Sequence, residues 1–233
     1  MDIGLVSEGP TDHAVIENML CGMLNQDDPD DFIQQLQPNA ADTEGGWYRV
    51  LDFISNDDFR QAFGFLDYLV IQIDTDVAGE KHFDVDLRDE NGRTLTCAIE
   101  IASRVQQRLI EQIDKKVPNF YQQYAERIIF AVSVHSIEVW LFKHFYTKQD
   151  KNKQLNGGER LLIGCLNKNQ KKFGQFYEKD KLIKNYDNYV ELSEDFYKPK
   201  TAAKAIKALV AKDESFALFH QQVLDIVDET AGV

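Results

Sequence analysis

The chain has 233 residues, of which 43% are hydrophobic and 28% are charged, so it can form one large domain or a domain with an appendage. No basic, apolar leader follows Met1 and no apolar run is long enough to span a bilayer, which predicts a cytoplasmic protein without membrane contact. Cys21, Cys97 and Cys165 lie far apart, which argues against a disulfide framework or a zinc site.

The charge is unevenly distributed along the chain. The formal net charge is −13, yet residues 143–212 hold 16 basic and 8 acidic side chains, whereas residues 1–100 hold 5 basic and 22 acidic ones. An acidic half beside a basic segment fits a metal site next to a phosphate-binding surface. The alternative is a solvated, lysine-rich helical face without a ligand.

In the first third of the chain, stretches typical of strands and of helices alternate. The predicted elements are a strand at 3–7, a helix at 12–24 capped by Thr11, a loop at 25–46 with a short helix near 32–36, a strand at 47–53, a helix at 55–65 capped by Ser55, and a strand at 68–73. The continuous apolar run at 68–73 is typical of a strand that is buried on both faces.

The rest of the chain continues this alternation and then becomes mainly helical. The predicted elements are a hairpin within 77–97 that turns at Asn91-Gly92, a helix at 99–117, a strand at 127–134, a helix at 136–145, a loop at 147–160, and helices at 201–212 and 215–227. The pattern predicts an α/β, Rossmann-like fold in which helices cover both faces of a parallel sheet. We expect this domain to span residues 1–146, with a basic, mainly helical region at 147–233 packed on or beside it.

Acidic residues directly follow two of the predicted strands. Glu8 comes after the strand at 3–7, and Asp74 and Asp76 come after the strand at 68–73. The carboxyl ends of parallel strands form the edge at which open α/β sheets bind ligands. Clustered carboxylates persist around a compensating cation, and hard oxygen donors suit Mg²⁺ or Mn²⁺. Taken alone, Glu8 also fits a capping or turn acid.

Two further residues are candidates for the same edge. Glu138 falls in the first turn of a helix that follows a buried strand, where it could bind metal or only complement the helix N-terminus. Lys200, preferred over Lys198 and Lys204, precedes a helix and could stabilise the charge of a phosphoryl transition state. The alternative for Lys200 is a surface lysine, and for the nearby strand-end residue His135 a structural role is favoured over acid–base catalysis.

Several common enzyme motifs are absent from the sequence. It contains no G-x-x-x-x-G-K-[ST], which excludes a P-loop ATPase within this chain. It also lacks a G-x-G-x-x-G after the first strand and a G-x-S-x-G anywhere, which argues against a dinucleotide enzyme and an α/β-hydrolase.

Three acidic motifs in this order resemble those of a known domain. Ser7-Glu8-Gly9-Pro10-Thr11-Asp12 followed by Asp74-Thr75-Asp76 resembles the TOPRIM domain of topoisomerases, primases, recombination proteins and OLD-family nucleases. With the later Ser136-Ile137-Glu138, the pattern is most similar to the OLD-type branch and its small stand-alone bacterial relatives. The resemblance covers about residues 1–145 and implies a TOPRIM-type sheet.

The resemblance also implies roles for individual residues and partners. The acids that match metal-site positions are Glu8, Asp12, Asp74, Asp76 and Glu138, and the lysine match is Lys200. OLD-type proteins usually join an ATPase to this domain, so a separate ATPase partner is one expectation. A role in bacterial defence against phage or mobile DNA is another.

The leading hypothesis is a Mg²⁺- or Mn²⁺-dependent nuclease that cuts DNA or RNA. Asp74, Asp76 and Glu8 would hold one ion, with Asp12 and Glu138 supporting it or a second one. The basic segment would bind the nucleic-acid backbone. The alternative is a non-catalytic metal- or nucleic-acid-binding subunit of a separate ATPase, and a nucleotide phosphoryl-transfer enzyme is a third possibility. Either role is compatible with a homodimer.

Overall fold

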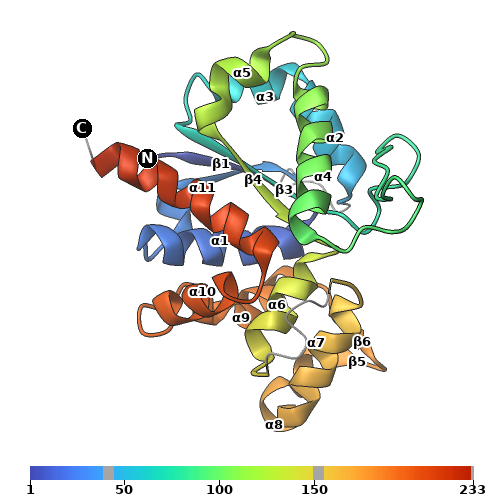
Figure 1. Ribbon diagram of the computed structural model, residues 1–233. Coiled ribbons are helices and arrows are strands. Elements are labelled where there is room, and N and C mark those ends of the chain that lie inside the picture. The colour runs from blue at the N-terminus through green and yellow to red at the C-terminus, as the bar shows by residue number, and fades with distance from the viewer. Residues whose placement is uncertain (39–44, 149–154, 232–233) are drawn as a thin grey trace.

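A four-stranded parallel sheet forms the centre of the protein (Figure 1). The structure, a computed structural model, describes residues 1–38, 45–148 and 155–231. The strands lie in the order β2-β1-β3-β4, with bounds Ile33–Gln37, Ile3–Val6, Tyr68–Asp74 and Ile128–Ser133. The chain passes from β1 outward to β2 and from β3 outward to β4, so the winding reverses between β1 and β3. Open α/β sheets bind ligands at this reversal point.

Helices cover both faces of the sheet (Figure 1). One face carries α1 (Pro10–Leu24) and α11 (Glu214–Ala231), and the other carries α2 (Trp47–Ser55), α3 (Asp57–Ala62), α4 (Ala98–Ile113) and α5 (Phe120–Tyr124). The predicted α/β fold with a parallel sheet and helices on both faces is therefore confirmed.

A second group of elements packs outside α1 and next to it. It contains α6 (Ile137–Phe145), α7 (Gly158–Leu166), α8 (Gln170–Phe173), α9 (Tyr186–Leu192) and α10 (Ala202–Val210), together with a small antiparallel ribbon of β5 (Tyr177–Glu178) and β6 (Lys181–Leu182). In Figure 1 these elements lie below α1, on the side away from the sheet. None of the helices in the described residues is long and apolar enough to cross a membrane.

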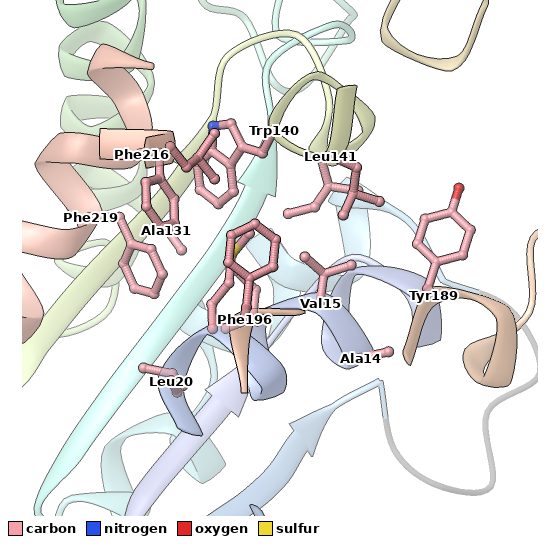
Figure 2. Packing of buried hydrophobic residues seen from close by; sticks show 14 of the residues in the cluster. Ala14, Val15, Leu20, Ala131, Trp140, Leu141, Tyr189, Phe196, Phe216 and Phe219 are labelled. Atoms are coloured by element: carbon pink, nitrogen blue, oxygen red, sulfur yellow. The ribbon is translucent and has the colours of Figure 1, made fainter. Parts of the chain in front are cut away.

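Side chains of the C-terminal region share one hydrophobic core with the sheet (Figure 2). Trp140 of α6 stacks on Phe219 of α11 with ring centroids 6.1 Å apart, and it meets Phe216 edge-on at 5.3 Å. Phe196 and Val70 of β3 belong to the same buried cluster. Residues on both sides of the expected boundary at 146 and 147 therefore contribute to one core. Burial of each such side chain stabilises the fold by about 1.5–3 kcal/mol.

The outer edge of β4 is covered by α11 through one amide side chain. Gln222 accepts a hydrogen bond from the Phe130 N–H at 3.0 Å and donates one to the Phe130 carbonyl at 3.1 Å. The amide therefore makes the two bonds that a neighbouring strand would make. An open sheet edge is a template for pairing with another chain, and Gln222 closes this one at Phe130.

Two of the predicted elements near the N-terminus are wrong. Residues 47–53, predicted as a strand, belong to helix α2, where Val50, Leu51 and Ile54 are buried at helical spacing. Residues 32–36, predicted as a short helix, lie mainly in strand β2, which pairs with β1.

Helix starts and the insertion after β3 also differ from the predictions. α1 is capped by Gly9 with Pro10 at its first position, and α3 is capped by the Asn56 side chain, instead of Thr11 and Ser55. The predicted hairpin within 77–97 is reduced to a single antiparallel bridge between Arg88 and Thr94. Arginines of α4 hold this loop in place, because Arg108 donates to the Phe83 carbonyl at 2.8 Å and Arg104 donates to the Asp86 carbonyl at 2.7 Å.

Candidate functional site

Glu8 and Asp74 meet at the reversal point of the sheet. The Asp74 N–H donates to Glu8 Oε1 at 2.7 Å, and the Glu8 N–H donates to Gln72 Oε1 at 3.1 Å. Gln72 is fully buried within β3, and its Nε2 donates to Asp74 Oδ1 at 3.0 Å. One side chain thus positions both carboxylates. Sequence reasoning missed Gln72, although a lone polar residue inside an apolar strand was a visible signal.

The turn after β4 brings α6 to the same place. The His135 carbonyl accepts from the N–H groups of Thr75 at 3.0 Å and Asp76 at 2.9 Å, and the His135 N–H donates to Thr75 Oγ1 at 2.7 Å. His135 has a φ of 73°, a left-handed conformation that costs energy in a non-glycine residue. The turn lets the Ile137 N–H donate to Asp74 Oδ1 at 3.1 Å, so the start of α6 is fixed beside Asp74.

Glu138 of α6 is buried and is held by two residues of the C-terminal region. The Tyr189 hydroxyl donates to Glu138 Oε1 at 2.7 Å, and Lys184 Nζ lies 2.8 Å from the same oxygen. Lys184 is also 3.9 Å from Glu159 Oε2. Lys184 is therefore the lysine that the structure places at the acidic cluster, and the sequence analysis did not select it.

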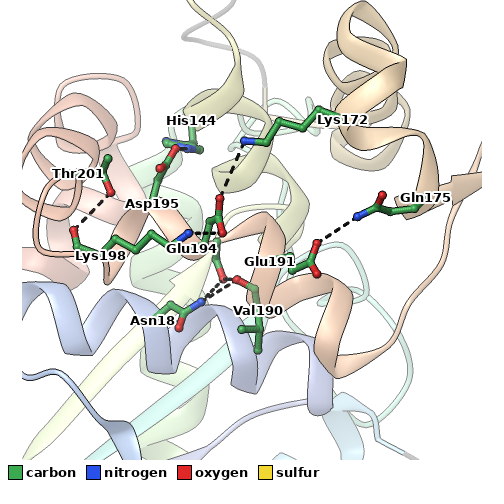
Figure 3. Close-up of polar contacts among 11 residues, drawn as sticks. Asn18, His144, Lys172, Gln175, Val190, Glu191, Glu194, Asp195, Lys198 and Thr201 are labelled. Carbon is green, nitrogen blue, oxygen red and sulfur yellow. Dashed lines mark hydrogen bonds and ion pairs between the residues drawn. The ribbon is translucent and has the colours of Figure 1, made fainter.

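Lys200 is not brought to this cluster. It is exposed in the turn before α10. A Cβ on Gly22 of α1 would lie 1.8 Å from the carbonyl oxygen of Phe196, so the chain preceding Lys200 crosses α1 near its C-terminal end. Gly22 is ten residues after Asp12, which is about 15 Å along the helix. Figure 3 shows the neighbouring Lys198 paired with Glu194.

Burial and mutual repulsion favour the protonated forms of the acids at the strand ends. Burial, reinforced by Asp12, raises the pKa of Glu8 to about 8. Burial, reinforced by Glu138, raises the pKa of Asp12 to about 7. The pKa of Asp74 is raised well above its ordinary value by burial and then by Asp12 and Glu8. These shifts are the signature of like charges that share a site.

The other two acids of the cluster are Glu138, whose pKa is lowered, and Asp76, whose pKa is raised against an opposing influence. Burial opposes ionisation of Glu138, but Lys184 and the hydrogen bonds outweigh it and hold the pKa of Glu138 below its ordinary value. Burial raises the pKa of Asp76, while His135 acts in the opposite direction. Among the residues that the structure describes, the cluster thus contains more carboxylates than Lys184, the cation paired with it, can neutralise.

The five predicted acids suit a hard divalent cation by their chemistry. Each influences the ionisation of others at the same strand ends, and all offer oxygen donors. Among the described residues, no three His, Cys, Asp or Glu side chains are spaced to coordinate a single ion. The fit therefore lies in donor type and surplus charge. Coordination would require these carboxylates to turn toward a common point.

A cavity of about 430 Å³ opens on the cluster. Asp74, Asp76 and Glu138 line it from the sheet side. The same cavity is lined by basic side chains from α7, β6 and the segment before α9, namely Arg160, Lys181 and Lys184, and by the acids Glu159 and Asp180 between them. Acidic and basic side chains in one cavity can hold a cation and an anion side by side, as a metal–phosphate complex requires.

Helix α9 connects the two helices that carry the acids. Asn18 of α1 donates from Nδ2 to the Val190 carbonyl at 3.0 Å and to Ser193 Oγ at 2.7 Å, and Figure 3 shows the contact with Val190. Tyr189 on the same helix reaches Glu138 of α6. The C-terminal region is therefore structurally part of the site.

Tyr189→Phe is expected to lower the unfolding free energy by about 1–2 kcal/mol, because the Glu138 carboxylate loses a buried donor. Under a metal-dependent activity, the variant should also need more metal for half-maximal rate. Thermal melts and a metal titration of the rate measure the two effects. The control is Tyr186→Phe on the same helix, whose hydroxyl donates to Glu17 at 2.7 Å and not to the cluster. An unchanged metal requirement in Tyr189→Phe would contradict the positioning role.

The fold and site together define an α/β protein with an open parallel sheet and a buried carboxylate cluster at its carboxyl edge. Comparison with protein-family models, curated proteins and solved structures gave no match to this chain.

Proposed function

We propose that this protein is a TOPRIM-type, Mg²⁺- or Mn²⁺-dependent nuclease that hydrolyses phosphodiester bonds in DNA or RNA. The observation that carries the proposal is the gathering of Glu8, Asp12 and Asp74 at one end of the sheet, where Glu8 accepts from the Asp74 N–H at 2.7 Å and partial or full burial raises the pKa of each acid. Burying like charges together destabilises a fold, and a divalent cation would offset that cost. The resemblance of the acidic motifs to OLD-type nucleases supports the same activity.

Roles follow from the position of each side chain. Asp74, Asp76 and Glu8 would hold one metal ion, and Asp12 and Glu138 would support it or a second one. Bound metal would supply an activated water and charge stabilisation for the leaving oxygen. Among the chain's own groups, Gln72 keeps Glu8 and Asp74 at a fixed separation, and the other hydrogen bonds to Asp74 limit its rotation.

Lys184 takes the role that the sequence analysis gave to Lys200. Its ammonium lies 2.8 Å from Glu138 and lines the same cavity as Asp74 and Asp76. A fixed positive charge at that place would stabilise the negative charge that develops on a phosphoryl group. In the absence of substrate it partly neutralises the carboxylates.

Nucleic acid is the proposed substrate because exposed basic side chains are concentrated in the segment that also supplies Lys181 and Lys184 to the cavity. Lysines are exposed over the segment that carries α8, β5 and β6, namely Lys168, Lys171, Lys172, Lys179 and Lys181. Affinity for a nucleic-acid backbone that binds this surface should fall steeply with salt. By resemblance, the biological setting would be bacterial defence against phage or mobile DNA, with a separate ATPase as a partner.

A cleavage assay tests the proposal. Labelled single- and double-stranded DNA and RNA are incubated with the protein in Mg²⁺, Mn²⁺ or EDTA, beside an Asp74→Ala/Asp76→Ala variant. Metal-dependent cutting by the wild type and not by the variant is the expected result. Binding without cutting under every condition would instead favour the non-catalytic subunit of a separate ATPase. If the protein neither binds nor cuts nucleic acid, both roles are rejected for the protein alone.

A further inference from the structure

Two cations in the cavity have no assigned partner. Arg160 and Lys181 are exposed and line the cavity that Asp74, Asp76 and Glu138 line from the other side. Neither forms a hydrogen bond or an ion pair through its side chain within the described residues 1–38, 45–148 and 155–231. This differs from Lys184, whose ammonium is already engaged by two carboxylates.

The backbone holds both cations at defined places relative to the acids. Arg160 lies in the first turn of α7, two residues after Gly158. A Cβ on Gly158 would lie 2.7 Å from the Val139 nitrogen and 2.9 Å from the Glu138 carbonyl carbon, so α7 begins in contact with the start of α6. Only glycine permits so close an approach, which brings the Arg160 side chain to the cavity.

The ribbon that carries Lys181 is fixed to the same helix. The Leu182 N–H donates to Glu159 Oε1 at 2.9 Å. In the antiparallel ribbon, the backbone of Lys181 lies opposite that of Glu178. The backbone next to Lys181 is thus tied to the residue that precedes Arg160. The segments that carry the two cations are therefore both attached to α6, and Asp180 lines the cavity beside them.

We propose that Arg160 and Lys181 form a binding subsite for a second phosphate of the substrate strand, next to the phosphodiester group held at the carboxylates. This inference rests on the proposed nuclease function. A guanidinium offers forked donors and an ammonium a compact charge, and both suit phosphate oxygens. The cavity of about 430 Å³ exceeds what one phosphate group needs and lies within the range of ligand sites in proteins.

The subsite defines the substrate class more narrowly than the metal site does. A diester with a single phosphate, such as bis(p-nitrophenyl) phosphate, would occupy only the carboxylate side of the cavity. An oligonucleotide would also place a neighbouring phosphate on Arg160 and Lys181. The enzyme should therefore prefer strands with at least two phosphates, and that preference should depend on the two cations.

The test uses the full chain with Arg160→Ala/Lys181→Ala. We expect kcat/KM on a 12-nucleotide single-stranded DNA, and on RNA of the same sequence, to fall on the order of 10-fold or more, because two charged phosphate contacts are lost. The rate on bis(p-nitrophenyl) phosphate should fall much less than the rate on the oligonucleotides. The control is Lys115→Ala/Lys116→Ala, which removes the same charge from the exposed turn after α4, at the opposite edge of the sheet.

Binding provides a readout that does not require cleavage. Fluorescence anisotropy of the labelled DNA in Ca²⁺ gives the dependence of affinity on salt, and the double variant should lower the slope by about 1.4 for two contacts to a single strand. An equal loss on the single-phosphate diester, or an unchanged slope, overturns the subsite. A wild type that cuts neither substrate overturns the proposed function instead, and the slope then decides the subsite by itself.

Discussion

Asp74→Asn is expected to abolish metal-dependent cleavage, with a loss of at least about 10³-fold, while raising the unfolding free energy of the metal-free protein by about 1–3 kcal/mol. Activity falls because a neutral amide is a poor metal ligand. Stability rises because Asp74 is a buried acid whose pKa is raised by burial and by its acidic neighbours. The amide oxygen can still accept the bonds from Gln72 and Ile137, so the local structure is kept.

Activity and stability are measured on the same preparation, by cleavage of labelled oligonucleotide in Mg²⁺ and by urea unfolding in EDTA. Asp52→Asn is a suitable control, because Asp52 is exposed on α2, away from the cluster. It should change neither quantity appreciably. Retained cleavage by Asp74→Asn would contradict the metal-site assignment, and a loss of stability in EDTA would contradict the account of buried repulsion.

Stability of the metal-free protein is expected to decrease as pH rises from 6.5 to 9. Glu8 has a folded-state pKa of about 8 and Asp12 of about 7, against ordinary values of 4.5 and 3.8. An acid with a raised folded-state pKa binds its proton more tightly in the folded protein. Its ionisation therefore destabilises the folded protein increasingly as pH rises from the pKa of the unfolded state to that of the folded state. Above the folded-state pKa the loss of stability is complete. Over this window the loss is about 2–3 kcal/mol.

The window is chosen to limit the contribution of the histidines. Burial lowers the pKa of His144 and His220 below 6.5, so both are largely neutral in the folded protein across the window and in the unfolded chain over most of it. Urea unfolding in EDTA at several pH values measures the effect, and Mg²⁺ should reverse it by binding the ionised carboxylates. A Glu8→Gln/Asp12→Asn variant should show a nearly flat profile. A wild-type profile that is equally flat would contradict the buried cluster.

The central elements of the fold were predictable because their signal is local. β1, β3 and β4 are continuous apolar runs, and the sheet forms where such runs alternate with helical periodicity. The edge strand β2 was not predictable in the same way, because its IQQLQ sequence has little apolar character. The aromatic residues at 47–53 favoured a strand by propensity, but the side chains that α2 buries in the core are Val50, Leu51 and Ile54, which share one face only in a helix.

The meeting of Glu8 and Asp74 could be predicted because each lies at the end of a strand. Glu8 and Asp74 need only the parallel arrangement of two strands to meet, and that arrangement follows from the alternation of elements. Lys184 could not be found by this reasoning, since it lies 46 residues after Glu138 and reaches it only through the packing of α7, β6 and α9. Choosing Lys200 applied a local rule, a lysine before a helix, to a contact that depends on tertiary structure.

The amide of Gln222 has a consequence for how this protein behaves when concentrated. With Phe130 capped on both its N–H and its carbonyl, the β4 side of the sheet is protected from strand pairing with a second molecule. A single change, Gln222→Ala, would expose both groups without touching the acids. The first observable effect of that change would be aggregation that increases with protein concentration, in a protein whose acidic cluster is intact.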